Sequence, residues 1–397
     1  MNVWAAPERP PGPSAELGLT AKIRHRLVAS RRPASPEAVG SALREVQPWL
    51  GAVDRLEVAK SVHADLAGLG PLQRILSDPR VSDICVNASR EVWIDRGDGM
   101  EPAGVAFEDE HQVRSLAVRL AQAAGRRLDD SSPFVDAALP EGIRLHAVLP
   151  PVADGGTCIS LRIPRSRGFS MAELVDAGTV SPAGAELLQR VVRRRLSFLV
   201  SGGAGSGKTT LLGALLSLAA PGERLVLVED TAELIVRAGH LVRLQGRPAN
   251  AEGSGAIAQS TLVRQALRMR PDRLVVGECR GVDVLDLLSA LNTGHDGGCG
   301  TVHANRACEV PARLEALAAP AGLARNALHS LLAAAVDAVI HLDRRPDGVR
   351  RVAELALCRR LADGRVEVVG AYRRLDAGEP VPGPAAADLD ARLAGTP

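Results

Sequence analysis

The stretch GGAGSGKT, residues 202–209, decides the fold of this chain. It fits the pattern G-x-x-x-x-G-K-[ST], in which glycines let backbone N–H groups turn inward around phosphate oxygens. The apolar segment LSFLVS (196–201) comes before it, and the segment TTLLGALLSLA (209–219) comes after it. A strand, a glycine-rich loop and a helix in that order predict a phosphate-binding loop, because the positive end of a helix favours anions.

The residues expected to hold a nucleotide belong to this loop and to the first turn of its helix. They are Gly202, Gly203, Ala204, Gly205, Ser206, Gly207, Lys208, Thr209 and Thr210. Lys208 is expected to neutralise the β- and γ-phosphates of ATP, and Thr209 to ligate Mg²⁺. The alternative is a glycine-rich turn that merely resembles the motif, and the flanking strand and helix argue against it.

Two acidic clusters follow apolar strands, in RLVLVEDTAEL (224–234) and RLVVGECRG (273–281). In open α/β sheets ligands bind beyond the carboxyl ends of strands, so both clusters lie at the correct edge. Glu278 is predicted to support the magnesium ion, on a strand expected beside the phosphate-loop strand, and Glu229 to polarise the attacking water. The alternatives are helix N-capping for Glu229 and Asp230, and a surface-loop acid for Glu278.

A histidine-containing segment, TGHDGGCGTVHAN (293–305), includes a short strand, CGTVH, that we expect in the sheet. Its two histidines, with Thr301 and Asn305, are typical of a segment that hydrogen-bonds a γ-phosphate and shifts when that group leaves. We therefore predict a catalytic or sensing role for His303, with a structural hydrogen bond as the alternative. Either interpretation fits His295.

Alternating strands and helices from residue 181 onward predict a parallel α/β core, and the preceding residues mix both element types. The expected organisation has five parts. They are a disordered, basic N-terminal segment (1–35), with a short helix or tail over 19–33, an α+β domain (36–165), a linker (166–180), an α/β ATPase domain (181–375) and a disordered tail (376–397).

Composition narrows the classes of partner. The chain has 397 residues, a net charge of +2 and 2% aromatic residues, which argue against nucleic acid as a partner. The basic run RVVRRRLS (190–197) is best explained as a solvated helix face. Six cysteines without metal-ligand spacing fit reduced thiols, and neither a signal peptide nor a membrane span is expected, which predicts a cytoplasmic protein.

With these segments assembled, the chain resembles the type II/type IV secretion ATPase superfamily, and most closely its tight-adherence (Flp pilus) branch. That family carries a Walker A motif, an Asp box, a Walker B motif of the form GE-x-R and a His box. Here they are GGAGSGKT, VEDTAEL, VVGECRG and TGHDGGCGTVHAN. LVRQALRMRPDR (262–273) and RPANAEG (247–253) also fit, and the likeness covers roughly residues 65–345.

The resemblance implies a RecA-like P-loop NTPase domain at the C-terminal end and an α+β N-terminal domain. It implies ATP and Mg²⁺, a hexamer with nucleotide between the two domains, and inner-membrane platform proteins as partners at the cytoplasmic face. Arg144 in GIRLHAVLPP and Arg162 in SLRIP match family arginines that reach the phosphates, with ordinary strand-edge arginines as the alternative. Arg280 matches a family position without an assigned role.

The chain departs from the family pattern at Gly298-Cys299-Gly300-Thr301 and at Arg306, and it lacks the tetracysteine zinc module of many type II secretion ATPases. Our first hypothesis is an ATP-hydrolysing motor that powers pilus assembly or protein secretion. The second changes the cargo to DNA, in conjugation or uptake. The third is a nucleotide-gated ring scaffold with little turnover, and a P-loop kinase is a fourth for which no acceptor site is visible.

Overall fold

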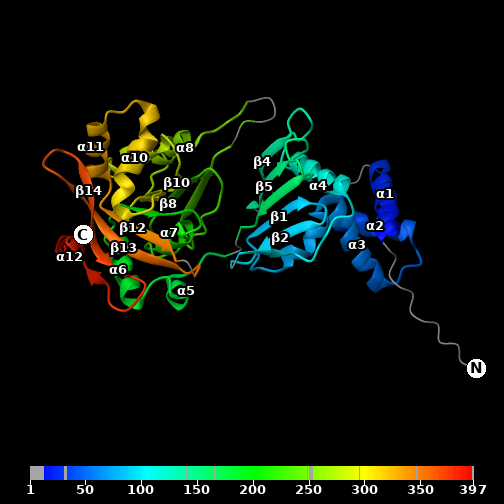
Figure 1. Ribbon diagram of the computed structural model, residues 1–397, viewed down its shortest axis with the longest axis horizontal. Helices are drawn as coiled ribbons and strands as arrows, with labels where there is room; N and C mark the ends of the chain where they lie inside the picture. The colour runs from blue at the N-terminus through cyan, green and yellow to red at the C-terminus, as the bar shows by residue number, and fades with distance from the viewer. Residues whose placement is uncertain are drawn as a thin grey trace, which may run out of the picture. The chain divides into compact units, whose positions relative to one another are not determined.

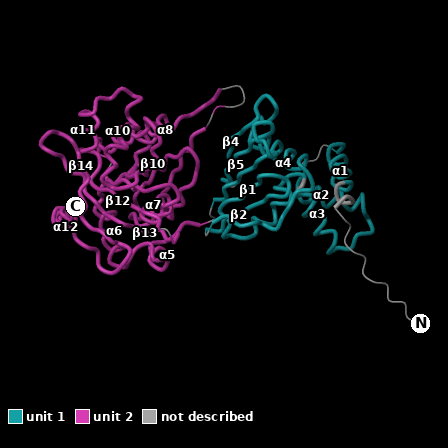
Figure 2. Tube along the Cα trace, in the orientation of Figure 1, with its two compact units in different colours: residues 1–164 teal, residues 165–397 magenta. Residues whose placement is uncertain are grey.

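The computed structural model describes residues 13–30, 34–97, 99–139, 142–164, 167–247, 249, 254–294, 296–345 and 347–395. The chain divides into two compact units, Met1–Pro164 and Arg165–Pro397, which are coloured separately in Figure 2. Among the residues that the structure describes, no helix combines the length and the apolar run needed to cross a bilayer.

Three helices open the first unit: α1 (Pro13–Ala29), α2 (Pro36–Val46) and α3 (Ala52–Ala67). They share a small apolar core that includes Ile23, Leu43 and Val62. The disorder expected before residue 19 is therefore corrected from Pro13 onward, whereas the helix that was one interpretation of 19–33 is present as the second half of α1. Leu19, Ile23 and Leu27 recur at helical spacing and are buried, so α1 gains packing energy.

A six-stranded antiparallel sheet follows, in the order β3-β2-β1-β6-β5-β4. Its strands are β1 (Asp83–Ala88), β2 (Glu91–Asp95), β3 (Met100–Pro102), β4 (Phe134–Ala138), β5 (Arg144–Val148) and β6 (Cys158–Arg162). Helix α4 (Glu110–Ala123) packs Val113 and Leu116 against the buried residues of this sheet. The edge strands β3 and β4 were not predicted, because they are short and β3 is exposed throughout.

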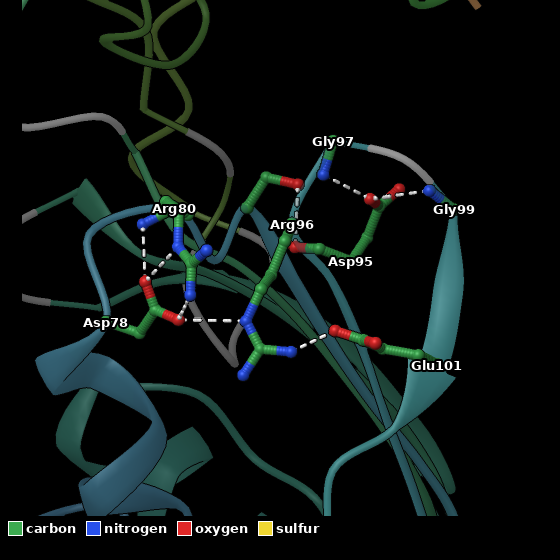
Figure 3. Close-up of polar contacts among 8 residues, drawn as sticks. Asp78, Arg80, Asp95, Arg96, Gly97, Gly99 and Glu101 are labelled. Atoms are coloured by element: carbon green, nitrogen blue, oxygen red, sulfur yellow. Dashed lines mark hydrogen bonds and ion pairs between the residues drawn. The ribbon is translucent and has the colours of Figure 1, made fainter.

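An ion cluster fastens the short 3₁₀ helix η1 (Gly70–Ser77) to the β2–β3 hairpin (Figure 3). Asp78 accepts hydrogen bonds from Arg80 (Nε, 3.0 Å; Nη2, 2.9 Å) and from Arg96 Nε (2.8 Å), and Arg96 also pairs with Glu101. The guanidinium groups of Arg80 and Arg96 hold the pKa of Asp78 well below its usual range. The carboxylate therefore stays charged through ordinary pH and keeps the cluster intact.

The second unit is built on a nine-stranded sheet among its described residues, in the order β15-β14-β13-β12-β7-β11-β10-β8-β9 (Figure 1). The six strands β12, β7, β11, β10, β8 and β9 are parallel. From β12 to β15, each strand pairs with its neighbour in antiparallel fashion. The bounds are β7 Phe198–Gly202, β8 Leu225–Glu229, β9 Leu241–Gln245, β10 Arg273–Cys279, β11 Cys299–His303, β12 Ala338–Arg344, β13 Arg350–Arg360, β14 Val366–Arg373 and β15 Val381–Pro382.

Helices cover both faces of this sheet, so successive strand residues enter opposite cores. Phe198 and Val200 of β7 join a core with α6 and α7, whereas Leu199 joins one with α8, α9, α10 and α11. The helices are α5 Met171–Asp176, α6 Pro182–Arg193, α7 Lys208–Leu216, α8 Gln259–Leu267, α9 Asp283–Leu291, α10 Val310–Ala318, α11 Arg325–Ala335 and α12 Ala386–Ala394. The predicted α/β core is thus confirmed.

One predicted neighbour relation is wrong. We expected the strand of Glu278 beside the phosphate-loop strand, but β11 lies between them and pairs in parallel with both β7 and β10. The small residues of β11 permit this: a Cβ added at Gly300 would lie 3.0 Å from the Val276 carbonyl oxygen. The strand of His303, and not that of Glu278, therefore adjoins the phosphate loop.

The C-terminal tail differs from expectation. Residues 376–397 were expected to be disordered, yet α12 buries Leu389 and Leu393 in the core of the second unit. These leucines stand four residues apart, a spacing that a Pro- and Ala-rich composition obscured. The linker expected over 166–180 was expected to include a lead helix, and α5 lies there, beginning at a capping box between Ser170 and Glu173.

A buried arginine at the start of β10 holds three chain segments together. Arg273, 1% exposed, pairs with Glu223 and donates to the carbonyl oxygens of Val192 (2.8 Å) and Gly297 (3.1 Å). Gly297 has φ +78°, and a Cβ there would strike the Arg273 guanidinium. The ion pair is therefore satisfied on all sides, which is the condition under which a buried pair is tolerated.

Replacing Arg273 by Met should lower the unfolding free energy of the second unit by about 3 kcal/mol, because Glu223 would lose its buried partner and the carbonyl oxygens of Val192 and Gly297 would lose their donor. Urea titration monitored by circular dichroism measures the change. The matched control is Arg195→Met, since Arg195 lies 3.6 Å from the same carboxylate but is 37% exposed, and about 1 kcal/mol or less is expected. Equal losses in both variants would contradict this assignment.

Candidate functional site

The phosphate loop leaves the sheet where β7 ends and becomes α7 at Lys208. Gly202 is required here, because a Cβ would lie 2.6 Å from the Leu342 carbonyl oxygen and 2.5 Å from Ser206 Oγ. Gly207, immediately before the helix, has φ +95°, a left-handed conformation that side chains disfavour. The loop thus takes the predicted shape and presents the free N–H groups of the first helical turn at its centre.

Lys208 is buried, 7% exposed, with its ammonium inside the loop. Nζ donates to the carbonyl oxygens of Gly202 (3.1 Å) and Gly203 (2.8 Å), and lies 3.3 Å from Nδ1 of His303. Burial lowers the pKa of Lys208, and the charge of Glu278 opposes this shift. The predicted phosphate-binding lysine is therefore held as a cation among oxygen acceptors at the carboxyl edge of the sheet.

His303 connects this lysine to the predicted acid. Its Nε2 lies 2.8 Å from Glu278 Oε1, and Arg280 Nη2 donates to the other carboxylate oxygen, Oε2, at 2.8 Å. Because Nδ1 faces an ammonium, it must accept, so the ring proton resides on Nε2 and is donated to Glu278. The structure thus brings Lys208, His303, Glu278 and Arg280 into one hydrogen-bonded chain.

The charges of these hydrogen-bonded residues shift one another's pKa values. Burial raises the pKa of Glu278, but the hydrogen bond from Arg280 and the nearby cations outweigh it, so the net pKa lies below the usual value. Burial and then the Lys208 ammonium lower the pKa of His303 below 6.5. At neutral pH the geometry therefore holds an ionised carboxylate against a neutral imidazole.

Glu229, at the end of β8, is buried and engaged differently. Its Oε1 accepts from the backbone N–H groups of Glu233 (3.0 Å) and Leu234 (2.8 Å), and Arg243 lies 3.4 Å from Oε2. The residues that follow form no helix through 240, so the helix-capping alternative is replaced by anchoring of an extended loop. Burial raises the pKa of Glu229, in the direction that a general base requires.

The residues around the loop fit a magnesium–triphosphate. Ser206 Oγ is buried and finds no hydrogen-bond partner among the described residues, so it is a polar atom available to a ligand. Thr209 follows Lys208 on α7, whereas the hydroxyl of Thr301 is occupied by the Gly277 carbonyl oxygen at 2.7 Å. Mg²⁺ usually takes one or two protein oxygens plus phosphates and waters, which Thr209 and Glu278 can supply.

The two predicted arginines of the first unit stand side by side. Arg144 of β5 is the register partner of Arg162 of β6, and Arg162 Nε donates to Asp83 of β1 at 3.0 Å. Arg144 begins β5 and Arg162 ends β6, so the two arginines lie at the same end of neighbouring strands. His295 and most of RPANAEG, residues 248 and 250–253, lie outside the described residues.

Sequence reasoning missed His341, the one polar residue between apolar neighbours in the segment AVIHL of β12. It is buried, with Nδ1 2.9 Å from Ser201 Oγ, directly before the phosphate loop. A backbone hydrogen bond also joins it to Asn305, the last residue of the histidine segment. A lone histidine in an apolar strand was the available signal. Its pairing with Ser201 depends on β12 lying beside β7.

Most of this chain is similar to known proteins. Residues 65–366 match the family described as type II/IV secretion system protein. A candidate conjugal transfer protein of Mycobacterium tuberculosis is 53% identical over 326 residues, covering 81% of this chain and 92% of the relative. The conjugal transfer protein TrbB of Rhizobium radiobacter is 34% identical over 285 residues, covering 70% and 84%.

Among solved structures, the pilus retraction motor PilT with bound ADP superposes with a TM-score of 0.50 at 17% identity, over 81% of this chain and 85% of that one. At this identity the likeness concerns the fold alone. Together with the strand order, it confirms the expected fold class: a RecA-like P-loop domain preceded by an α+β unit.

The lowered pKa of His303 predicts how the stability of the site depends on pH. Because the folded pKa of His303 is depressed, its hydrogen bonds to Lys208 and Glu278 should contribute fully to stability above about pH 6.5, and that contribution should be lost as the pH falls below this value towards the lowered pKa. Histidine NMR titration measures the pKa. Lys208→Met should raise it by removing a cation, and Glu278→Gln should lower it further by removing an anion. Shifts of the opposite sign would refute the arrangement.

Proposed function

The chain belongs to the type II/IV secretion system protein family, and from that premise we propose that it is an ATP-hydrolysing motor of such a machine. The observation that carries the proposal is the chain of contacts from Lys208 through His303 to Glu278 at the mouth of the phosphate loop. It joins a phosphate-binding cation, a hydrogen-bonding imidazole and an ionised acid within one site. P-loop NTPases use such a lysine to hold the phosphates and such an acid to support magnesium.

In this mechanism Lys208 exchanges its bonds to the Gly202 and Gly203 carbonyl oxygens for the β- and γ-phosphates of ATP. Bound Mg²⁺ would neutralise developing charge on the phosphates, with Thr209 and Glu278 positioned to hold it. Glu229, whose pKa is raised by burial, polarises the water that attacks in line. The water oxygen bonds to the γ-phosphorus as the bond from that phosphorus to the β–γ bridging oxygen breaks, the bridging oxygen leaves with ADP, and the proton lost by the water passes through Glu229 to solvent.

His303 is proposed as the sensor of the γ-phosphate. It bridges the lysine and the acid, so movement of Lys208 toward a ligand removes the donor from Nδ1 and leaves Glu278 as its partner. A ligand that changes these contacts has different affinities for two conformations, which is the requirement for a conformational motor. Arg144 and Arg162 are proposed to contact the phosphates within a hexamer, and platform proteins at the inner face of the cytoplasmic membrane are proposed as partners.

The cargo follows from two separate arguments. The chain as a whole resembles the tight-adherence branch most closely, so we propose pilus assembly or protein secretion first. The relatives named as conjugal transfer proteins support DNA transfer as the second candidate. Deleting the gene and measuring surface pili, secreted protein and conjugation frequency separates the two, since only one output should be lost.

Turnover by size-separated oligomers tests the reaction. Lys208→Ala and Glu278→Gln should each lower ATP hydrolysis by about 100-fold or more, because each removes a charge that acts on the transition state. Lys60→Ala is the matched control, as Lys60 lies on α3 with its side chain 63% exposed. Phosphate release measures the rates, and circular dichroism checks folding.

Equal turnover in wild type and both variants would remove the site assignment. ATP binding without turnover by the wild type would instead support the nucleotide-gated scaffold.

A further inference from the structure

The hairpin between β12 and β13 lies against the phosphate loop. Leu342 is the register partner of Gly202, so β12 runs alongside β7 to the point where the loop begins. Past that point the hairpin continues, and Arg344 of β12 is the register partner of Arg350 of β13. This register places two guanidinium groups side by side at the tip of the hairpin.

Both arginines approach the centre of the loop. Arg350 Nε donates to the Gly205 carbonyl oxygen at 2.9 Å, and its Cδ would lie 3.2 Å from a Cβ placed on Gly207. Arg344 Nη1 would lie 4.0 Å from a Cβ placed on Gly205, and the residue is exposed. The glycines that wrap the phosphates are therefore flanked by two guanidinium groups from the same unit.

Two neighbouring arginines at the tip of the hairpin, Arg345 and Arg351, lie beside carboxylates. Arg351 pairs with Asp343 at 2.6 and 3.0 Å, and Arg345 lies 3.7 Å from Asp347. Arg344 instead donates to a neutral group, the carbonyl oxygen of Gly348, at 3.3 Å. Arg351 and Arg345 thus lie beside acids of the hairpin, whereas Arg350 contacts the phosphate loop and Arg344 lies near it.

We propose that Arg344 and Arg350 form a second phosphate-binding element, supplied by the same unit as the loop. Arg350 is a positioning residue that fixes the Gly205 carbonyl and hence the orientation of the loop N–H groups. Arg344 contacts the phosphate oxygens of a bound nucleoside triphosphate, which a planar fork of donors fits. This inference rests on the proposed function, because it assigns further residues to the same nucleotide site.

Calorimetric titration of the full chain with Mg-ATP tests the pair. Arg344→Ala should weaken binding about 10-fold, the effect of one lost charge-assisted hydrogen bond, and Arg344→Lys should recover part of it. Arg350→Met and Arg350→Lys should weaken binding alike, because a lysine restores the charge but not the Nε bond to Gly205. Arg345→Ala, from the same hairpin, is the control and should stay within about twofold of wild type.

Thermal unfolding of each variant confirms that the hairpin still folds. Binding by Arg344→Ala equal to wild type would overturn the arginine pair alone, and so would an equal loss in Arg345→Ala, which would indicate a general field effect. Recovery by Arg350→Lys would overturn the positioning role. Failure of the wild type to bind Mg-ATP would overturn the proposed function itself, so the two failures are distinguishable.

Discussion

The placement of β11 between β7 and β10 is the constraint on which the site depends. A parallel strand must satisfy its backbone groups on both sides, and β11 does so with residues small enough to pack between two buried neighbours. Its last residue, His303, therefore emerges between Lys208 of the loop and Glu278 of β10. No single one of the sequence motifs contains this contact, because it arises from strand order.

The rest of the second unit supports that edge. Arg273, at the start of β10, ties three segments at the end of the strands opposite the phosphate loop. On the other flank, β12 brings His341 under the loop and Arg350 against Gly205. Rigid strands below and exchangeable hydrogen bonds above suit a site in which ligand contacts change, since only the upper contacts need to move.

The sequence was sufficient where local pattern and local structure coincide. GGAGSGKT predicted the loop because glycine at 202 and 207 answers a local requirement for close approach and positive φ. It was insufficient for relations between distant segments. The position of β11 and the opposition of Arg344 and Arg350 depend on strand order and register. The buried leucines of α12 stand at helical spacing in the sequence, but the surrounding composition favoured a prediction of disorder.

The central claim is that a triphosphate replaces the present partners of Lys208. The chain contains three lysines, Lys22, Lys60 and Lys208, so a lysine-labelled sample gives three side-chain signals that single substitutions assign. The NMR spectrum should be recorded with and without Mg-ATP. The account predicts a large shift of the Lys208 signal alone, because its ammonium leaves backbone carbonyls for phosphate oxygens. A Lys208 signal that stays in place at saturating Mg-ATP would contradict it.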